Sequence, residues 1–114
     1  MVPGIDVNSR GQWGSRKNQF QYTGRSALGV DKAGNLIYVA GRQMNLHIIA
    51  DALVGAGAIR GMELDIHGGL QSFSSWRPSR GGSVRPTKLL PSMTRSARRY
   101  LKPDQRDFFY ITQR

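Results

Sequence analysis

Between residues 24 and 76, apolar residues recur first at every second position, then about every 3.6 residues, and then at every second position again. Leu28 and Val30 alternate with small residues, and residues 36–40 form a second apolar run. Residues 31–35, DKAGN, separate these two runs and carry turn-forming side chains with one glycine. Two apolar runs joined in this way predict a β-hairpin.

The next apolar residues recur at helical spacing. They are Leu46, Ile49, Leu53 and Ala56, preceded by Asn45 and followed by Gly57. Asparagine is a favoured N-terminal cap and glycine a favoured C-terminal stop. We therefore expect one main helix in this part of the chain.

Residues 59–66 alternate again, which predicts a strand. Side chains alternate along a strand, so Glu63 and Asp65 are expected on one face, opposite Met62 and Leu64. A hairpin, a helix and a strand in this order imply a crossover, right-handed if the flanking strands are parallel. The predicted class is α+β, with a mixed sheet, one helix packed on it and a parallel crossover.

The remaining segments give weaker patterns. Residues 1–23 contain turn chemistry and no apolar period, so this N-terminal segment is expected to be irregular. Further on we expect a short strand at 72–76, a basic Pro/Gly-rich loop region at 76–103 with a helical turn near 96–100, and a closing strand at 108–111. A chain of 114 residues is sufficient for one domain.

Composition excludes several kinds of site. Cysteine is absent and only His47 and His67 are present, so disulfides and thiolate metal sites are excluded and no metal or cofactor is expected. The first residues lack the basic start and apolar region of a signal peptide, and no run reaches the length of a membrane span.

The net charge of +10 is unevenly distributed. Residues 1–75 carry seven Lys or Arg against five Asp or Glu, whereas residues 76–114 carry ten against two. Such a tail favours solvated surface charge, with nucleic-acid binding as the alternative. No stripe of Arg and Lys interleaves with aromatic residues, which argues against a recognised nucleic-acid module.

Polar residues and glycines follow directly on the strand predicted at 59–66. Asp65 and His67 stand beside Gly68 and Gly69. A strand that ends in this way can deliver polar side chains to the rim of a cleft, where glycines let a ligand approach the backbone. The alternative for Asp65 is a residue that caps loop amides. Glu63, two residues earlier, would lie roughly 6 to 7 Å away from it along a strand.

Four pieces of the sequence resemble a known family. They are the strand GRSALGV at residues 24–30, the turn DKAG at 31–34, Gly57-Ala58 after the helix, and Leu64-Asp65 before small residues. In this order they resemble the C-terminal half of the phosphodiester glycosidase family, the N-acetylglucosamine-1-phosphodiester α-N-acetylglucosaminidase-like domain. The family's L-D-G-G-G-S box reads Leu64-Asp65-Ile66-His67-Gly68-Gly69 here, which looks like a bacterial subgroup with L-D-I-N.

The resemblance implies hydrolysis of a sugar phosphodiester. For this chemistry Arg25 would bind phosphate through its planar fork, and Asp65 would serve as acid, base or nucleophile. The spacing of Glu63 from Asp65 along the strand could serve a catalytic carboxylate pair. Substrate-binding residues would be His67, Gly68, Gly69 and Ser72. On residue type alone, an arginine at a strand start is more often a structural ion-pair partner.

The same resemblance implies a larger domain and a setting. The family's N-terminal half would be missing, so an exposed apolar patch is expected where it packed. Arg25 and Asp65 are expected to meet at one rim of the sheet. Full-length members would be extracellular or on the cell surface, with a sugar-phosphate or cell-wall polymer as substrate. Two alternatives to hydrolysis are a non-catalytic carbohydrate or cell-wall-binding protein, and a basic nucleic-acid-binding protein.

Overall fold

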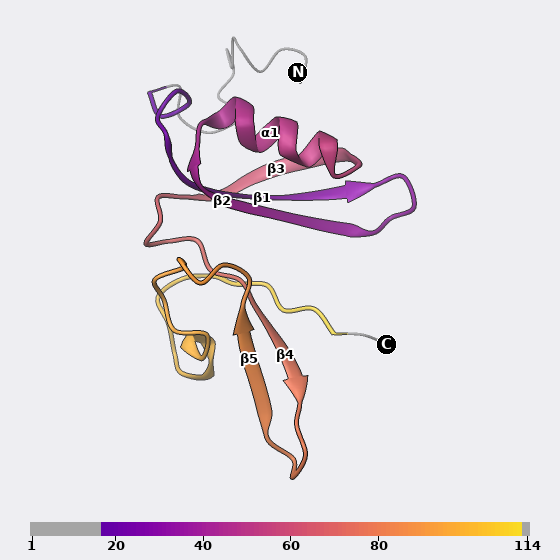
Figure 1. Ribbon diagram of the computed structural model, residues 1–114, viewed down its shortest axis with the longest axis vertical. Coiled ribbons are helices and arrows are strands. Elements are labelled where there is room, and N and C mark those ends of the chain that lie inside the picture. Colours follow the sequence, from indigo (N-terminus) through magenta and orange to yellow (C-terminus); the bar gives the residue numbers. More distant parts are fainter. Residues whose placement is uncertain (1–16, 113–114) are drawn as a thin grey trace.

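The computed structural model describes residues 17–112 of the chain. A three-stranded sheet carries one helix, and a two-stranded hairpin extends away from this unit (Figure 1). The elements are β1 (Thr23–Asp31), β2 (Leu36–Met44), α1 (Leu46–Gly55), β3 (Ala58–Ile66), β4 (Ser74–Pro78), β5 (Val84–Lys88) and the 3₁₀ turn η1 (Arg99–Leu101).

The larger sheet has the order β2-β1-β3, and β1 pairs antiparallel with both neighbours. β2 and β3 therefore run in the same direction on either side of β1, and α1 connects them across one face of the sheet. The α+β class is confirmed. The hydrogen-bonded pairs among residues 17–112 are all antiparallel, so the expected mixed sheet is replaced by one whose parallel strands are not neighbours.

Local hydrogen bonds explain the β1–β2 hairpin. The Asp31 carboxylate accepts from the backbone N–H of Asn35 at 2.8 Å and from its side-chain amide at 2.9 Å. Gly34 adopts φ 87°, a backbone region that glycine enters without steric cost. The predicted hairpin is therefore confirmed, with its turn where the sequence indicated it.

The predicted helix is also confirmed. The Asn45 side chain accepts from the backbone N–H of Ile48 at 3.0 Å, which satisfies one of the free donors at the start of α1. Gly57, at φ 95°, follows the last turn and donates its N–H to the Val54 carbonyl. Both signals predicted from residue type operate as caps.

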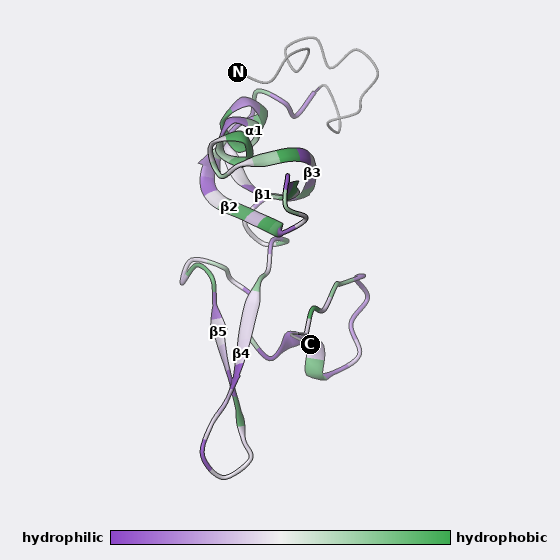
Figure 2. Cartoon of the chain, turned by 90° about the vertical axis from the view of Figure 1, so that its right-hand side faces the viewer, coloured by the Kyte–Doolittle hydropathy of each residue, from purple (hydrophilic) through white to green (hydrophobic). Residues whose placement is uncertain are grey.

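The core lies between α1 and the sheet. Hydrophobic stretches occur in these elements, whereas the β4–β5 hairpin is largely pale or purple (Figure 2). Gly29 and Gly61 allow close contact with the helix, because an added Cβ would lie 3.1 Å and 2.8 Å from methyl groups of Leu53. The buried cluster comprises Ala27, Leu46, Ile49, Ala50 and Leu53, flanked by Ile37, Val39, Met44 and Ala58.

The basic Pro/Gly-rich region differs most from expectation. The strand predicted at 72–76 is shifted to Ser74–Pro78, and part of the predicted loop forms its partner Val84–Lys88. Gly81 and Gly82 both adopt positive φ and close the turn, across which Ser79 N–H donates to the Ser83 carbonyl at 2.8 Å. Proline is tolerated in such a ribbon because each strand is an edge strand.

The last described residues contain no strand. Residues 108–111 are not paired and are exposed, so the predicted closing strand is wrong. The expected helical turn is a single 3₁₀ turn, η1, somewhat later than predicted. Just after it, a two-pronged hydrogen bond from Arg99 to Asp104 lowers the pKa of that carboxyl to about 2.

Residues 18–21 pack against the start of α1 without forming regular structure. The Leu46 N–H donates to the Gln19 carbonyl at 2.9 Å, and Gln19 is buried. Of the segment 1–23 that was expected to be irregular, residues 1–16 lie outside the described part of the chain, and Thr23 already belongs to β1.

Candidate functional site

Arg25 lies inside the protein and has a structural environment. It is 1% exposed, and its guanidinium donates to the Glu63 carboxylate and to the carbonyls of Met44, Gln21 and Asn18. The Met44 and Gln21 contacts measure 2.8 Å and 3.0 Å. Four of the five N–H donors of a guanidinium are thereby used within the chain. The structural ion-pair reading of Arg25 fits this geometry, and a phosphate grip does not.

A β-bulge separates the two carboxylates of β3. Ala27 pairs with Glu63 but Arg25 pairs with Ile66, so three residues of β3 span two residues of β1. The extra residue interrupts the alternation of side chains. Glu63 therefore stays on the helix-covered face with Arg25, and its side chain is 8% exposed. The expectation that Glu63 and Asp65 share one face is wrong.

Asp65 lies on the opposite face of the sheet from Arg25. Its backbone N–H and carbonyl both contact the Ser26 hydroxyl, at 3.2 Å and 3.3 Å, and Ser26 points away from Arg25 because successive side chains alternate. The Asp65 carboxylate is half-exposed and lies 3.9 Å from the guanidinium of Arg106. The expected meeting of Arg25 and Asp65 at one rim is therefore also wrong.

His67 begins the turn that follows β3. Its φ of 74° places it in the left-handed region, which histidine enters at some steric cost. Its N–H donates to the Gly24 carbonyl at 2.7 Å, and its Nδ1 lies 3.4 Å from the Thr23 hydroxyl. The Gly69 carbonyl accepts from Arg95 at 3.1 Å. The turn is thus held against the start of β1.

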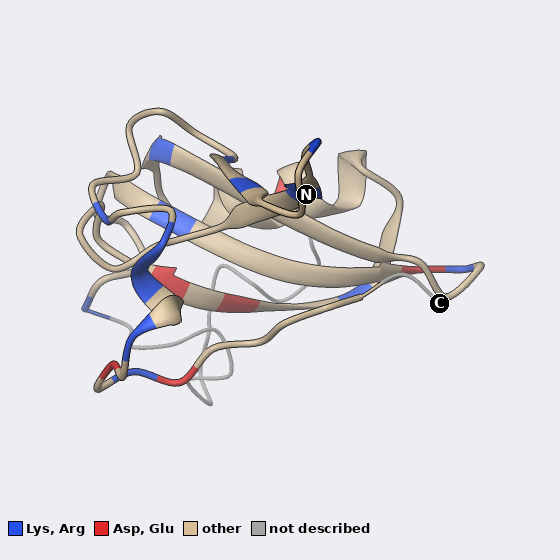
Figure 3. Cartoon of the chain, turned by 90° about the horizontal axis from the view of Figure 1, so that it is seen from below, with Lys and Arg blue, Asp and Glu red and all other residues tan. Residues whose placement is uncertain are grey.

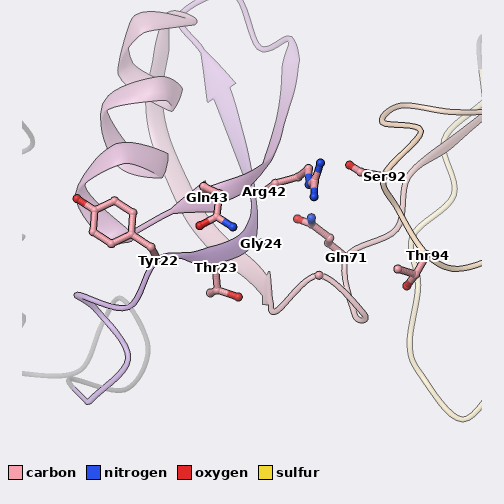
Figure 4. Close-up of a pocket in the computed structure, with 9 residues that line it drawn as sticks. Tyr22, Thr23, Gly24, Arg42, Gln43, Gln71, Ser92 and Thr94 are labelled. Carbon is pink, nitrogen blue, oxygen red and sulfur yellow. The ribbon is translucent and has the colours of Figure 1, made fainter.

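A polar cavity of about 300 Å³ opens beside this turn. It lies at the end of the sheet where β1 begins and β2 ends, and residues beyond β5 close its other side (Figure 4). Gly68 is the predicted substrate-binding residue that lines it, whereas His67, Gly69 and Ser72 stand outside the lining. The lining residues are Tyr22, Thr23, Gly24, Arg42, Gln43, Gly68, Gln71, Ser92 and Thr94.

Gln71 is the most informative residue of the cavity. It is 2% exposed, and its Nε2 has a long contact of 3.4 Å with the Gly41 carbonyl. Its Oε1 is buried and has no hydrogen-bond partner among the described residues. A buried carbonyl without a donor is costly, so this atom indicates a place for a ligand donor or a water.

Arg42 contributes positive charge to the same cavity. It is exposed and forms no ion pair among residues 17–112. Its side chain and those of Gln71 and Ser92 point toward one another from different segments of the chain (Figure 4). Sequence reasoning missed Arg42, Gln71, Ser92 and Thr94. Only the position of Gln71, just after the Gly-Gly turn, could have drawn attention to one of them.

Glycine at position 24 makes this arrangement possible. A Cβ there would lie 2.9 Å from Gln71 Nε2 and 2.9 Å from both Cα and N of Gly68. Such contacts are too short for any side chain, and two of the three atoms belong to backbone. Gly24 therefore lets the turn after β3 lie directly against β1.

Tyr38 connects the sheet face opposite α1 to the segment that leads into β4. Its ring stacks on Phe73 with centroids 4.6 Å apart. Burial raises the pKa of the Tyr38 phenol above its usual value, more than its hydrogen bond with Ser26 lowers it. The phenol stays protonated at neutral pH.

Two kinds of site receive no support within residues 17–112. No group of three or more His, Cys, Asp or Glu side chains is placed to hold a metal ion. No helix in this range is long and apolar enough to span a membrane.

Comparisons with known proteins found no match: no family model, no curated protein and no solved structure matches this chain.

Proposed function

We propose that this chain binds a sugar phosphodiester in the polar cavity beside Gly68, as part of a phosphodiester glycosidase-type hydrolase. The observation that carries the proposal is the Gln71 carbonyl, which has no hydrogen-bond partner within residues 17–112, beside the Arg42 guanidinium, which has no ion-pair partner there. The Gln71 carbonyl can accept a hydrogen bond from a ligand, and the Arg42 guanidinium can bind an anion. A sugar hydroxyl or N-acetyl N–H beside a phosphate supplies both.

The rest of the lining suits the same ligand class. Thr23, Ser92 and Thr94 carry hydroxyls that both donate and accept, as sugar recognition requires. Tyr22 adds an aromatic ring at the edge, and Gly24 and Gly68 leave the backbone accessible.

In the hydrolytic reaction Asp65 is the proposed acid or base. It is half-exposed near the end of β3, outside the cavity lining but three residues before Gly68, whereas Glu63 is held by Arg25 in the interior. Glycoside cleavage needs a carboxyl group that can exchange a proton with the leaving or attacking oxygen. We assign Arg42, rather than Arg25, to the phosphate.

Binding is tested by calorimetric titration of the chain with the methyl diester of N-acetylglucosamine 1-phosphate. Arg42→Gln should weaken binding about tenfold or more, because it removes a charge-assisted contact worth about 1.5 to 3 kcal/mol. Lys32→Gln is the matched control: it removes the same charge from the exposed β1–β2 turn and should leave affinity unchanged. Equal affinity of both variants would contradict the assignment of the cavity.

Hydrolysis is tested separately, by release of N-acetylglucosamine from the same diester. Asp65→Asn should lower kcat far more than it changes KM, since the carboxylate acts on charge that develops in the transition state. Retained binding with no turnover in the unchanged chain would instead support a non-catalytic carbohydrate-binding protein.

A further inference from the structure

The β4–β5 hairpin is a basic ribbon without acidic residues. Residues 74–88 contain Arg77, Arg80, Arg85 and Lys88 and no Asp or Glu. The hairpin points away from the three-stranded sheet (Figure 1). Viewed from the side to which it points, Lys and Arg segments predominate over Asp and Glu segments (Figure 3).

The strand register separates this ribbon into two unlike faces. Arg77 pairs with Arg85, and Ser75 pairs with Thr87, so these four exposed side chains share one face. Trp76 pairs with Pro86 on the other face. Side chains directly opposite each other are about 4.5 to 5.5 Å apart at Cβ. We call the face with Arg77, Arg85, Ser75 and Thr87 the arginine face.

Two arginines directly opposite one another repel unless an anion lies between them. Neither Arg77 nor Arg85 has a carboxylate partner among residues 17–112, and Arg80 adds a third unpaired cation in the turn. Ser75 and Thr87 add hydroxyl donors beside them. The face is therefore suited to phosphate groups, which accept hydrogen bonds from guanidinium and hydroxyl together.

The cavity lies at the base of this hairpin. Gln71 precedes β4 by three residues, and Ser92 and Thr94 follow closely after β5. A polymer with one unit in the cavity can therefore continue along the ribbon. We propose that the arginine face binds the neighbouring phosphates of a linear, non-nucleotide poly(sugar or polyol phosphate) chain. This inference rests on the proposed function, because it takes the cavity as the site of one sugar-phosphate unit.

Nucleic acid is the alternative polyanion. The positions of the aromatic and arginine side chains on the two faces of the hairpin argue against it. Single-stranded nucleic acids are held by aromatic rings on which bases stack, next to cations for the backbone. Trp76 lies on the opposite face from Arg77 and Arg85, and Phe73 is stacked on Tyr38. The arginine face thus carries side chains that can bind phosphate and no aromatic ring on which a base could stack.

The test uses the full chain with two probes, poly(glycerol phosphate) and a single-stranded DNA oligonucleotide of equal charge. The variant Arg77→Ser/Arg85→Ser should bind poly(glycerol phosphate) about tenfold more weakly. The plot of log affinity against log salt should also become shallower by about 0.7 to 0.9 per arginine removed. The control Lys32→Ser/Arg60→Ser makes the same charge change at exposed positions in the β1–β2 turn and on β3, and should retain both values.

The outcomes separate this inference from the proposed function. Arg77→Ser/Arg85→Ser should leave binding of the methyl diester of N-acetylglucosamine 1-phosphate intact, while Arg42→Gln should weaken it about tenfold or more. Equal loss of polymer binding in the hairpin variant and the control would overturn the inference and leave the cavity assignment standing. Tighter binding of the oligonucleotide than of poly(glycerol phosphate), lost in the hairpin variant, would overturn it in favour of nucleic acid.

Discussion

Arg25 shows how a residue that attracts attention in the sequence can be structural. Its guanidinium joins β3, the end of β2 and the residues before β1 through Glu63, Met44, Gln21 and Asn18. Buried ion pairs contribute little net stability when complete, but removing one partner leaves an uncompensated charge. Arg25 therefore holds one end of the sheet together and is not placed to bind a ligand.

The first prediction concerns this residue. Arg25→Lys should lower the free energy of unfolding by about 2 to 4 kcal/mol, because an ammonium group cannot reach all four acceptors. Urea denaturation followed by circular dichroism measures the change. Arg60→Lys, exposed on β3, is the control and should change stability by less than about 0.5 kcal/mol. An unaffected Arg25→Lys variant would show that the buried contacts carry no net energy.

A second prediction concerns the backbone at His67, whose φ is 74°. His67→Asn should raise the free energy of unfolding by about 0.5 kcal/mol, since asparagine tolerates the left-handed region better. Gly34→Ala, at φ 87° with nothing near its Cβ position, isolates the same backbone effect with the opposite sign. It should lower the free energy of unfolding by about 1 kcal/mol. Thermal unfolding of both variants should show a raised melting temperature for His67→Asn and a lowered one for Gly34→Ala.

At the scale of elements, the stacked rings of Tyr38 and Phe73 join the larger sheet to the segment before β4. The folded pKa of Tyr38 lies above its value in the unfolded chain. The folded state therefore holds the phenolic proton more tightly, and this contribution is complete below the unfolded pKa. It is lost as pH rises from about 10 through the folded pKa.

We expect from this that alkaline conditions weaken the attachment of β4–β5. Stability should fall above about pH 10, and Tyr38→Phe should show a smaller fall over the same range. Urea denaturation at a series of pH values gives the comparison, with Tyr110→Phe as the control because Tyr110 is exposed. Identical pH profiles for Tyr38→Phe and the unchanged chain would contradict this account.

At the scale of the whole molecule, the sheet face opposite α1 is largely open. Leu28 pairs with both Tyr38 and Met62, and Val30 pairs with Leu36, so these residues form two adjoining rows on that face. Met62 is 51% exposed and Leu36 is 56% exposed. Monomeric proteins seldom leave such rows uncovered, and β3 is also an edge strand with free backbone groups.

The fourth prediction is that the chain self-associates through this face. Sedimentation velocity should show a weight-average mass that rises with protein concentration. Leu36→Lys/Met62→Lys should reduce this rise, because charged side chains on open sheet surfaces oppose pairing. Both positions are exposed, so the fold should persist, which circular dichroism verifies. A monomer at every concentration would contradict the prediction.

Several features of the fold could be predicted because they depend on residues close together in the sequence. The β1–β2 turn relies on Asp31 and Asn35, four residues apart, and the helix cap on Asn45 and Ile48, three apart. Gly57 ends α1 through its own backbone conformation. Turn chemistry, caps and helical spacing act within one or two turns of chain, so residue type alone predicted these elements.

The candidate site could not be predicted in the same way, because it depends on contacts between residues that are far apart in the sequence. The bulge that separates Glu63 from Asp65 comes from the pairing of β3 with β1, and Ser26 contacts Asp65 from 39 residues away. The β4–β5 ribbon likewise needed the pairing of two weak, proline-containing strands.

The amino-acid sequence by itself determined the hairpin, the helix and the presence of a strand after the helix, whereas the pairing of that strand with β1 was decided by the tertiary structure. Tertiary structure decided that Arg25 is buried, and it brought Arg42, Gln71 and Ser92 to one cavity. The physical reason is distance along the chain. Local hydrogen bonds form wherever the right residue types stand together, whereas a cavity forms only when separate segments pack against one another.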